Sequence, residues 1–289
     1  MPGGGADHPP EPSARRRALG SASARSLLLT VLGEFVHPRQ ERVWTATLLE
    51  ALTALGVEEK SARQALARTA KEGLLVSSRH GRRVLWTLTE DGGRLLEEGT
   101  RRIYGFMRER HPWDGTWLVL SVVIPEAQRQ LRHRLRTRLT WLGLGSPSSG
   151  LWVSPDATKA RDVHVALRQL GLEKQSFAWT GPATGIGDEG RLLTRAWDLV
   201  DVEDRYLAFL EGFESREAET PGDAFVAQVQ MVQEWRRFPF LDPDLPVELL
   251  DHDWPGARAA ATFHDRHARW HALAQAEWDR LDASPGAKP

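Results

Sequence analysis

The most informative absence from this sequence of 289 residues is cysteine, which does not occur at all. Disulfide bonds, thiolate nucleophiles and thiolate zinc sites are therefore excluded. The sequence also lacks any apolar run long enough to cross a bilayer, and residues 1–23 lack the apolar segment of a secretory signal. We expect a cytoplasmic protein with no membrane association, in which residues 1–23 form a disordered tail.

Acidic residues are scarce in one short segment, although the whole chain is nearly balanced. The net charge is -1, from 38 basic and 39 acidic residues. Residues 1–110 contain 18 basic and 13 acidic residues, a balance of +5, so the remainder carries -6. Between residues 61 and 83 the only acid is Glu72, against six Lys and Arg residues. Such a local basic footprint is what binding to DNA phosphates requires.

The pattern of residues 24–90 predicts a winged helix-turn-helix domain. Apolar residues at helical spacing predict three helices, at Ala24–Val36, Trp44–Leu55 and Glu59–Glu72. Two β-prone runs follow, Leu74–Ser77 and Val84–Leu88, with Gly81 at the centre of the intervening turn. Three helices followed by a hairpin is the element order of a winged helix.

The third helix has the composition of a DNA recognition helix. Its polar and basic side chains lie opposite the core stripe, so that base edges and phosphates can be reached together. The hairpin tip adds further basic residues of the kind that lie along the DNA backbone. An ordinary solvated surface is the alternative for any one of these residues alone. The predicted DNA-binding residues are Lys60, Ser61, Arg63, Gln64, Arg68, Lys71, Arg79, His80, Arg82 and Arg83.

Beyond the winged helix the pattern predicts an α+β multidomain protein. Residues 91–112 read as a helical connector. Residues 113–182 alternate strands and helices, which suggests a ferredoxin-like α/β domain. Residues 190–281 read as a helical C-terminal domain. The predicted elements are strands Trp117–Ile124, Leu151–Val153 and Gln175–Thr180, and helices Glu126–Leu142, Ala157–Leu170, Arg191–Leu210, Pro221–Phe238 and Ala257–Leu281.

Stretches in all three predicted domains resemble the PaaX family of phenylacetate-degradation repressors. They are ARSLLLTVLGEFV at Ala24–Val36, WLVLSVVIPE at Trp117–Glu126, GLWVSP at Gly150–Pro155 and WRRFPFLDPDLPVELLDHDWPG at Trp235–Gly256. The last stretch is the most specific, because a generic winged helix protein would not carry it. Two departures occur near the recognition helix: Glu58 and Glu59 stand where the family has a capping serine, and Thr69 replaces a leucine.

The resemblance implies a homodimeric repressor that binds double-stranded operator DNA and is released by an aryl-CoA thioester such as phenylacetyl-CoA. It implies no resident cofactor and no enzymatic activity. Two alternatives remain open. The same kind of regulator could control another acyl-CoA or secondary-metabolite pathway, or the protein could be a ligand-binding or scaffolding protein without operator binding.

Candidates for ligand contact lie in the last two predicted domains. The phosphates of an acyl-CoA need arginines, and Arg132 and Arg136 are four residues apart on a predicted helix. The tryptophans Trp152, Trp235 and Trp254 could line a pocket for an aromatic acyl group. The alternatives are a solvated helix face for the arginines and ordinary core packing for the tryptophans.

Metal-dependent chemistry has little support in the sequence. A nuclease needs a metal-binding carboxylate at the end of the first strand of the middle domain, and Glu126, the nearest acid, follows Pro125. On the last helix His264, His267 and His271 share one face, which makes them weak candidates for a metal site. The alternative is a polar face on an amphipathic helix, and we predict no metal.

Overall fold

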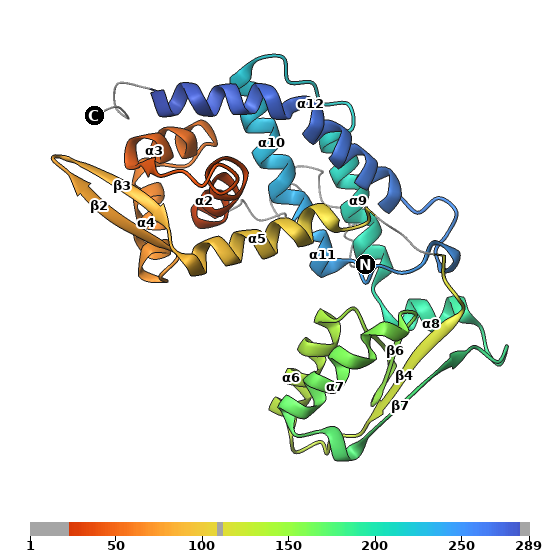
Figure 1. Cartoon of the computed structure of the whole chain (residues 1–289). Coiled ribbons are helices and arrows are strands. Elements are labelled where there is room, and N and C mark those ends of the chain that lie inside the picture. Colours follow the sequence, from red (N-terminus) through yellow and green to blue (C-terminus); the bar gives the residue numbers. More distant parts are fainter. Residues whose placement is uncertain (1–22, 109–111, 284–289) are drawn as a thin grey trace, which may run out of the picture. The chain divides into compact units, whose positions relative to one another are not determined.

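The computed structural model describes residues 23–108 and 112–283, so almost all of the predicted tail lies outside the described residues. Helices and two antiparallel sheets make up the structure, which confirms the multidomain α+β class (Figure 1). The chain divides into two compact units. The first, called here the N-terminal unit, contains residues 23–96 and 275–283, and the second contains the rest. No helix in the described part is both long and apolar enough to span a membrane.

The N-terminal unit begins with helix α2 (Ala24–Val31), which continues into a π-helical turn, η1 (Leu32–Val36). The side-chain oxygen of Ser23 caps α2 by accepting a hydrogen bond from the backbone N–H of Ser26 at 3.1 Å. Leu28, Leu32 and Phe35 are completely buried, as the helical spacing of the apolar residues predicts.

Helices α3 (Thr45–Ala54) and α4 (Glu59–Lys71) pack with α2 around this core. A three-stranded antiparallel sheet of order β1-β3-β2 completes the unit, with β1 at Val43–Trp44, β2 at Leu75–His80 and β3 at Arg83–Leu88. His80 pairs with Arg83, so the hairpin turn consists of Gly81 and Arg82, and the φ of +62° at Gly81 suits glycine. The predicted helices and hairpin are confirmed, whereas the short strand β1 was not predicted.

Helix α5 (Glu90–Gly105) follows strand β3, and only glycine fits at position 92 in its first turn. A Cβ atom on Gly92 would lie 2.2 Å from the carbonyl oxygen of Leu74, whereas nothing lies within 4 Å of a Cβ on Gly93. The hydroxyl of Thr89 accepts a hydrogen bond from the backbone N–H of Gly92 at 3.0 Å and donates to the carbonyl of Gly73. The first turn of α5 is therefore held tightly against the segment that follows α4.

The second unit contains a four-stranded antiparallel sheet of order β5-β6-β4-β7. Its helices α6 and α7 cover one face, where Leu118 and Leu120 of β4 pack against Leu135 and Leu139 of α6 (Figure 1). The bounds are β4 Thr116–Val122, α6 Arg129–Trp141, β5 Gly145–Ser148, β6 Leu151–Ser154, η2 Ala157–Lys159, α7 Ala160–Leu170, η3 Glu173–Gln175 and β7 Ser176–Pro182.

Strand β5 is a correction to the sequence-based prediction, which placed only a loop at Gly143–Gly150. The segment Gly145–Ser148 has no alternation of apolar residues and contains Pro147. Proline is tolerated only at the edges of sheets, and β5 is an edge strand. The strand therefore gives almost no sequence signal.

The C-terminal helices differ from the prediction at one break. The single helix expected at Arg191–Leu210 is two helices, α8 (Glu189–Ala196) and α9 (Leu199–Phe213). Between them Trp197 adopts an extended conformation and donates its indole N–H to the carbonyl of Gly143 at 3.2 Å. The remaining helices are α10 (Pro221–Trp235), α11 (Phe238–Leu241), the 3-10 turn η4 (Val247–Leu249) and α12 (Gly256–Ala283).

Candidate nucleic-acid interface

Helix α4 separates its core residues from its polar residues as a recognition helix requires. Ala62, Ala65 and Leu66 are buried, and Thr69 is buried with its hydroxyl donating to the carbonyl of Ala65 at 2.9 Å. Threonine in place of leucine is therefore accommodated without an unpaired hydroxyl. On the opposite side the predicted DNA-binding residues Lys60, Arg63, Gln64, Arg68 and Lys71 are exposed, and Ser61 is half-buried.

The first turn of α4 holds one of these arginines in an ion pair. Glu58 is the N-cap residue, but its side chain makes no capping hydrogen bond. Glu59 instead accepts hydrogen bonds from Nε and Nη2 of Arg63, at 2.9 Å and 2.6 Å, and both side chains remain largely exposed. Arg63 must therefore leave Glu59, or share it, before its guanidinium can contact a nucleic acid.

The hairpin tip presents further basic side chains to solvent. Arg79, His80 and Arg82 are exposed and Arg83 is half-buried. The guanidinium of Arg79 donates to the carbonyl of Gly81 at 3.2 Å, and the ring of His80 lies edge-on to Trp44 with centroids 5.8 Å apart. These contacts order the tip while Arg79, His80 and Arg82 stay accessible, whereas Nη1 of Arg83 is buried.

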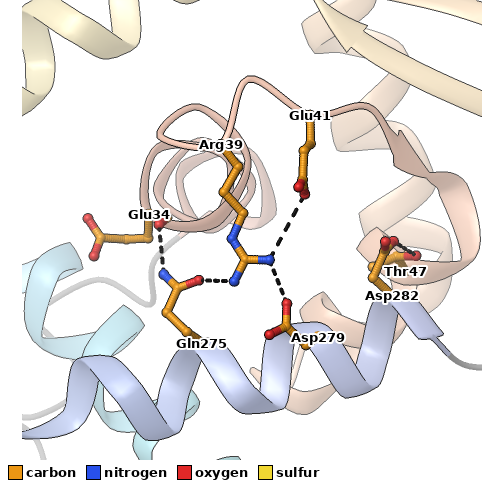
Figure 2. A network of polar contacts seen from close by, with 7 residues as sticks. All are labelled: Glu34, Arg39, Glu41, Thr47, Gln275, Asp279 and Asp282. Atoms are coloured by element: carbon orange, nitrogen blue, oxygen red, sulfur yellow. Dashed lines mark hydrogen bonds and ion pairs between the residues drawn. The ribbon is translucent and has the colours of Figure 1, made fainter.

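A second set of contacts fixes the helical core of the N-terminal unit to the last turns of α12 (Figure 2). Arg39 donates to Asp279 at 2.5 Å and to Gln275 at 2.6 Å. The amide of Gln275 in turn donates to the backbone carbonyl of Glu34 at 3.3 Å. Residues 275–283 are therefore an integral part of this unit.

Two further contacts extend this attachment. The buried hydroxyl of Thr47 donates to Asp282 at 3.0 Å. Next to it the buried rings of Phe35 and Trp278 stack at 5.4 Å. Residues 275–283 lie outside the predicted winged helix range 24–90, and the only hint in the sequence is that Trp278 and Leu281 continue the apolar spacing to the end of the helix.

The predicted ligand residues lie in two different settings of the second unit. Arg136 is exposed and Arg132 half-buried on α6, where Arg132 donates to the backbone carbonyl of Glu126 at 3.1 Å. Trp152 packs beneath α6 in the core of the sheet. Trp235 and Trp254 belong instead to an aromatic cluster among the C-terminal helices. Trp235 is fully buried there, so core packing accounts for its position.

The histidines of α12 are used for packing and hydrogen bonding. The hydroxyl of Tyr104 and Nε2 of His267 lie 2.9 Å apart, and the rings of His267 and His271 stack at 5.4 Å. Burial, followed by the charges of Arg108 and His267, lowers the pKa of His264. Among the described residues no group of three or more His, Asp and Glu side chains is arranged to hold a metal ion.

Models of one protein family match three successive parts of this chain. They are the PaaX-like protein at residues 23–92, the PaaX protein central Cas2-like domain at residues 110–192 and the PaaX-like protein C-terminal domain at residues 197–280. Together these ranges cover most of the sequence. The chain belongs to the PaaX family.

A characterised member and a solved structure extend this finding. The transcriptional repressor PaaX of Escherichia coli (strain K12) is 30% identical over 248 residues, which cover 82% of this chain and 77% of that protein. The structure of an uncharacterized protein from Mycobacterium tuberculosis, 24% identical, has a TM-score of 0.62 and covers 91% of this chain and 100% of that one. The second similarity concerns the fold alone.

The stretch that most specifically suggested the PaaX family has a structural role. Phe238 lies parallel to Tyr206 with ring centroids 4.2 Å apart, and Trp235 stacks on Phe263 at 4.8 Å. The hydroxyl of Tyr206 donates to the carboxylate of Asp242 at 2.5 Å. Part of the motif thus supplies the buried centre of the C-terminal helices, whereas Phe240 and Val247 of the same stretch are exposed.

Proposed function

We propose that this PaaX-family protein is a transcriptional repressor whose N-terminal unit is a winged helix-turn-helix. Helix α4 is the recognition helix and β2–β3 is the wing. The observation that carries the proposal is the exposed basic face of α4 beside a basic hairpin tip, both supported by one core. Arg63 and Gln64 are assigned to base edges, because their side chains can donate to major-groove acceptors.

Ser61 and the other basic residues of this surface are assigned to the DNA backbone. Phosphate contacts fix the position and orientation of the recognition helix without reading sequence. Electrostatic contacts of this kind make binding strongly dependent on salt. The residues assigned to phosphates are Lys60, Ser61, Arg68, Lys71, Arg79, His80, Arg82 and Arg83.

The middle domain is proposed to be ferredoxin-like. Its element order is strand, helix, two strands, helix and strand, and the spatial order β5-β6-β4-β7 places the first and third strands side by side at the centre. This arrangement supports the proposal. We also propose that the protein acts as a homodimer in the cytoplasm, as a repressor of near-palindromic operators does.

The regulated operon is proposed to serve phenylacetate catabolism, with an aryl-CoA thioester such as phenylacetyl-CoA as the effector. The effector would bind better to the DNA-incompetent form and so draw the protein from its operator. The similarity to the E. coli transcriptional repressor PaaX supports the role of a repressor, whereas the pathway and the effector are taken from the resemblance to the family. The alternative is a repressor that works in the same way but responds to another acyl-CoA and controls another pathway. Arg132, Arg136, Trp152, Trp235 and Trp254 remain predicted effector contacts.

The proposal is tested by selecting genomic fragments that the full-length protein binds and measuring their affinity at several salt concentrations. Arg63→Ala with Arg68→Ala is expected to weaken binding at least tenfold and to reduce the salt dependence. Arg94, which pairs with Glu90 on the exposed side of α5, provides the control variant Arg94→Ala. If the wild type bound no DNA at any salt concentration, the proposal would fail. The remaining possibility would then be a ligand-binding or scaffolding protein without operator binding.

The same fragments serve to test the effector. Phenylacetyl-CoA is titrated into the complex beside free phenylacetate and beside CoA alone. Release by the thioester only is the expected result. Indifference to all three would remove the effector assignment and leave the assignment of DNA binding intact.

A further inference from the structure

Helix α6 carries a concentration of positive charge that the assignment of DNA binding to α4 leaves unexplained. Five of its 13 residues are arginine, and the helix contains no acidic residue. His133 adds a sixth basic side chain. Arg129, Arg134, Arg136 and Arg138 are exposed. We call this set, Arg129, Arg132, His133, Arg134, Arg136 and Arg138, the basic face of α6.

The charges of this face are not neutralised within the described part of the protein. Several arginines elsewhere in the second unit do pair with carboxylates: Arg205 with Asp201, Arg258 with Glu214 and Arg269 with Asp265. None of the five arginines on α6 forms an ion pair with another described residue. Arg132 and Arg138 donate only to neutral groups, the carbonyl of Glu126 and the side chain of Gln169.

This arrangement works against the stability of the helix. Arg132 and Arg136 are four residues apart, as are Arg134 and Arg138, and like charges at this spacing repel on a helix surface. Glutamate in place of alternate arginines would keep this surface polar and would replace the repulsion by attraction between unlike charges. The uncompensated charge therefore points to an anionic partner that binds from outside.

The surface also contains a recess suited to a phosphate group. Arg134 and Arg138 lie beside His133 and Thr137 at a depression of about 370 Å³ between α6 and α7. Gln169 and Leu170 of α7 form its other wall. These side chains offer several hydrogen-bond donors to one anion, and arginine is the residue best suited to phosphate oxygens.

We propose that the basic face of α6 binds the phosphate backbone of operator DNA outside the segment that α4 reads, in place of the effector contact predicted above for Arg132 and Arg136. The proposal rests on the proposed function for the presence of DNA. A helix of 13 residues is roughly 20 Å long, a length over which duplex DNA presents about 12 phosphates. Basic side chains spread along this length and on both flanks of the exposed side of the helix match a polyanion better than one small ligand, which would contact only part of them.

The test compares full-length variants on two duplexes, one limited to the operator core and one extended by flanking sequence on both sides. The variant Arg134→Gln, Arg136→Gln, Arg138→Gln removes three exposed charges from α6. The matched control Arg205→Gln, Arg258→Gln, Arg269→Gln removes three charges that are ion-paired in the same unit. Circular dichroism establishes that both variants are folded.

The α6 variant is expected to lose at least tenfold in affinity for the extended duplex and to change little on the core duplex. Its plot of log affinity against log salt should be shallower by up to about 3, because each lost phosphate contact removes about 0.9 from the slope. The control should behave as the wild type on both duplexes.

Three results would overturn the proposal. The α6 variant could bind the extended duplex as the wild type does, or could lose the same affinity on both duplexes. It could also bind DNA normally but require more phenylacetyl-CoA for release, which would assign these arginines to the effector instead. If the wild type bound neither duplex, the proposed function itself would fail, so the two failures are distinguishable.

Discussion

The ring of Phe35 stacks on the indole of Trp278 with centroids 5.4 Å apart, so helical segments from opposite halves of the sequence share one core. Both side chains are buried. Around them Arg39 and Thr47 donate hydrogen bonds to Asp279 and Asp282 of the same helix end. The sequence predicts a winged helix domain of residues 24–90. In the structure, residues 275–283 belong to the same compact unit.

Removal of the indole by Trp278→Ala is expected to loosen the N-terminal unit. Truncation of a buried tryptophan to alanine costs about 3–5 kcal/mol. Amide hydrogen exchange in α2 and α3 should accelerate by about 100-fold or more, because local opening then requires less free energy. Mass spectrometry of peptides covering residues 24–54 measures this change.

The control is Trp179→Ala, which removes an indole of the same size that is 58% exposed on β7. Exchange in residues 24–54 should stay at the wild-type rate in this variant. Equal rates in Trp278→Ala and the wild type would show that the contact between α12 and α2 contributes nothing to the stability of the unit.

Adjacent glycines at the start of α5 provide a test of the packing there. Gly92→Ala places a methyl group 2.2 Å from the carbonyl oxygen of Leu74, and overpacking of this kind costs about 1–3 kcal/mol. Gly93→Ala meets no atom within 4 Å and should stabilise the helix by up to about 1 kcal/mol. Thermal unfolding should therefore show a lower midpoint for the first variant and a higher one for the second. Equal shifts in both would contradict the close packing at Gly92.

The parts of the fold that the sequence predicts correctly are those with a strong local pattern. The periodic burial of Leu28, Leu32 and Phe35 and the glycine turn at Gly81 each have a cause within a few residues. Strand β5 was missed because Gly145–Ser148 is short and polar and pairs only at the edge of a sheet. At the break between α8 and α9, Asp198 caps α9 through its side chain, a local signal that the prediction of one helix overlooked, whereas the hydrogen bond from Trp197 to distant Gly143 has no local pattern.

The candidate site also contains some features that the sequence predicts and others that it does not. The exposed position of Arg63, Gln64 and Arg68 follows from the core spacing on α4. The ion pair from Glu59 to Arg63 also follows a local rule, the spacing of four residues on a helix. The contacts of Arg39 with Gln275 and Asp279 could not be predicted, because they join residues at opposite ends of the sequence.

The ion pair at the start of α4 leads to a prediction about affinity that rests on the proposed function. Glu59→Gln keeps the length of the side chain but frees Arg63 and removes a negative charge from the DNA-facing surface. One charge about 7 Å from a phosphate costs about 0.6 kcal/mol in water, so DNA affinity should rise about threefold. Fluorescence anisotropy with a selected genomic fragment measures the change.

Glu90→Gln is the matched control, because Glu90 also pairs with an arginine four residues later at the start of an exposed helix. It should leave DNA affinity unchanged. A decrease in affinity for Glu59→Gln would mean that the carboxylate positions Arg63 for binding rather than competing with DNA.

Acidification is expected to destabilise the second unit through His264. Burial lowers the pKa of this imidazole, and the neighbouring charges of Arg108 and His267 lower it further. The unfolded chain, with the ordinary histidine pKa of about 6.5, therefore binds a proton at a pH at which folded His264 remains neutral. The stability that His264 contributes is complete above the ordinary pKa and decreases as the pH falls toward the lowered one.

Urea unfolding at pH 7.5 and pH 5.5 tests this linkage, with the two values chosen to lie about one unit on either side of the ordinary histidine pKa. The midpoint of the wild type should decrease between them, and His264→Gln should reduce that decrease because the variant has no proton to bind at this position. His252→Gln is the control, because the side chain of His252 is fully exposed and meets solvent in both the folded and the unfolded chain. If His264→Gln loses as much stability on acidification as the wild type and the control, the pH dependence originates elsewhere and His264 is only a packing residue.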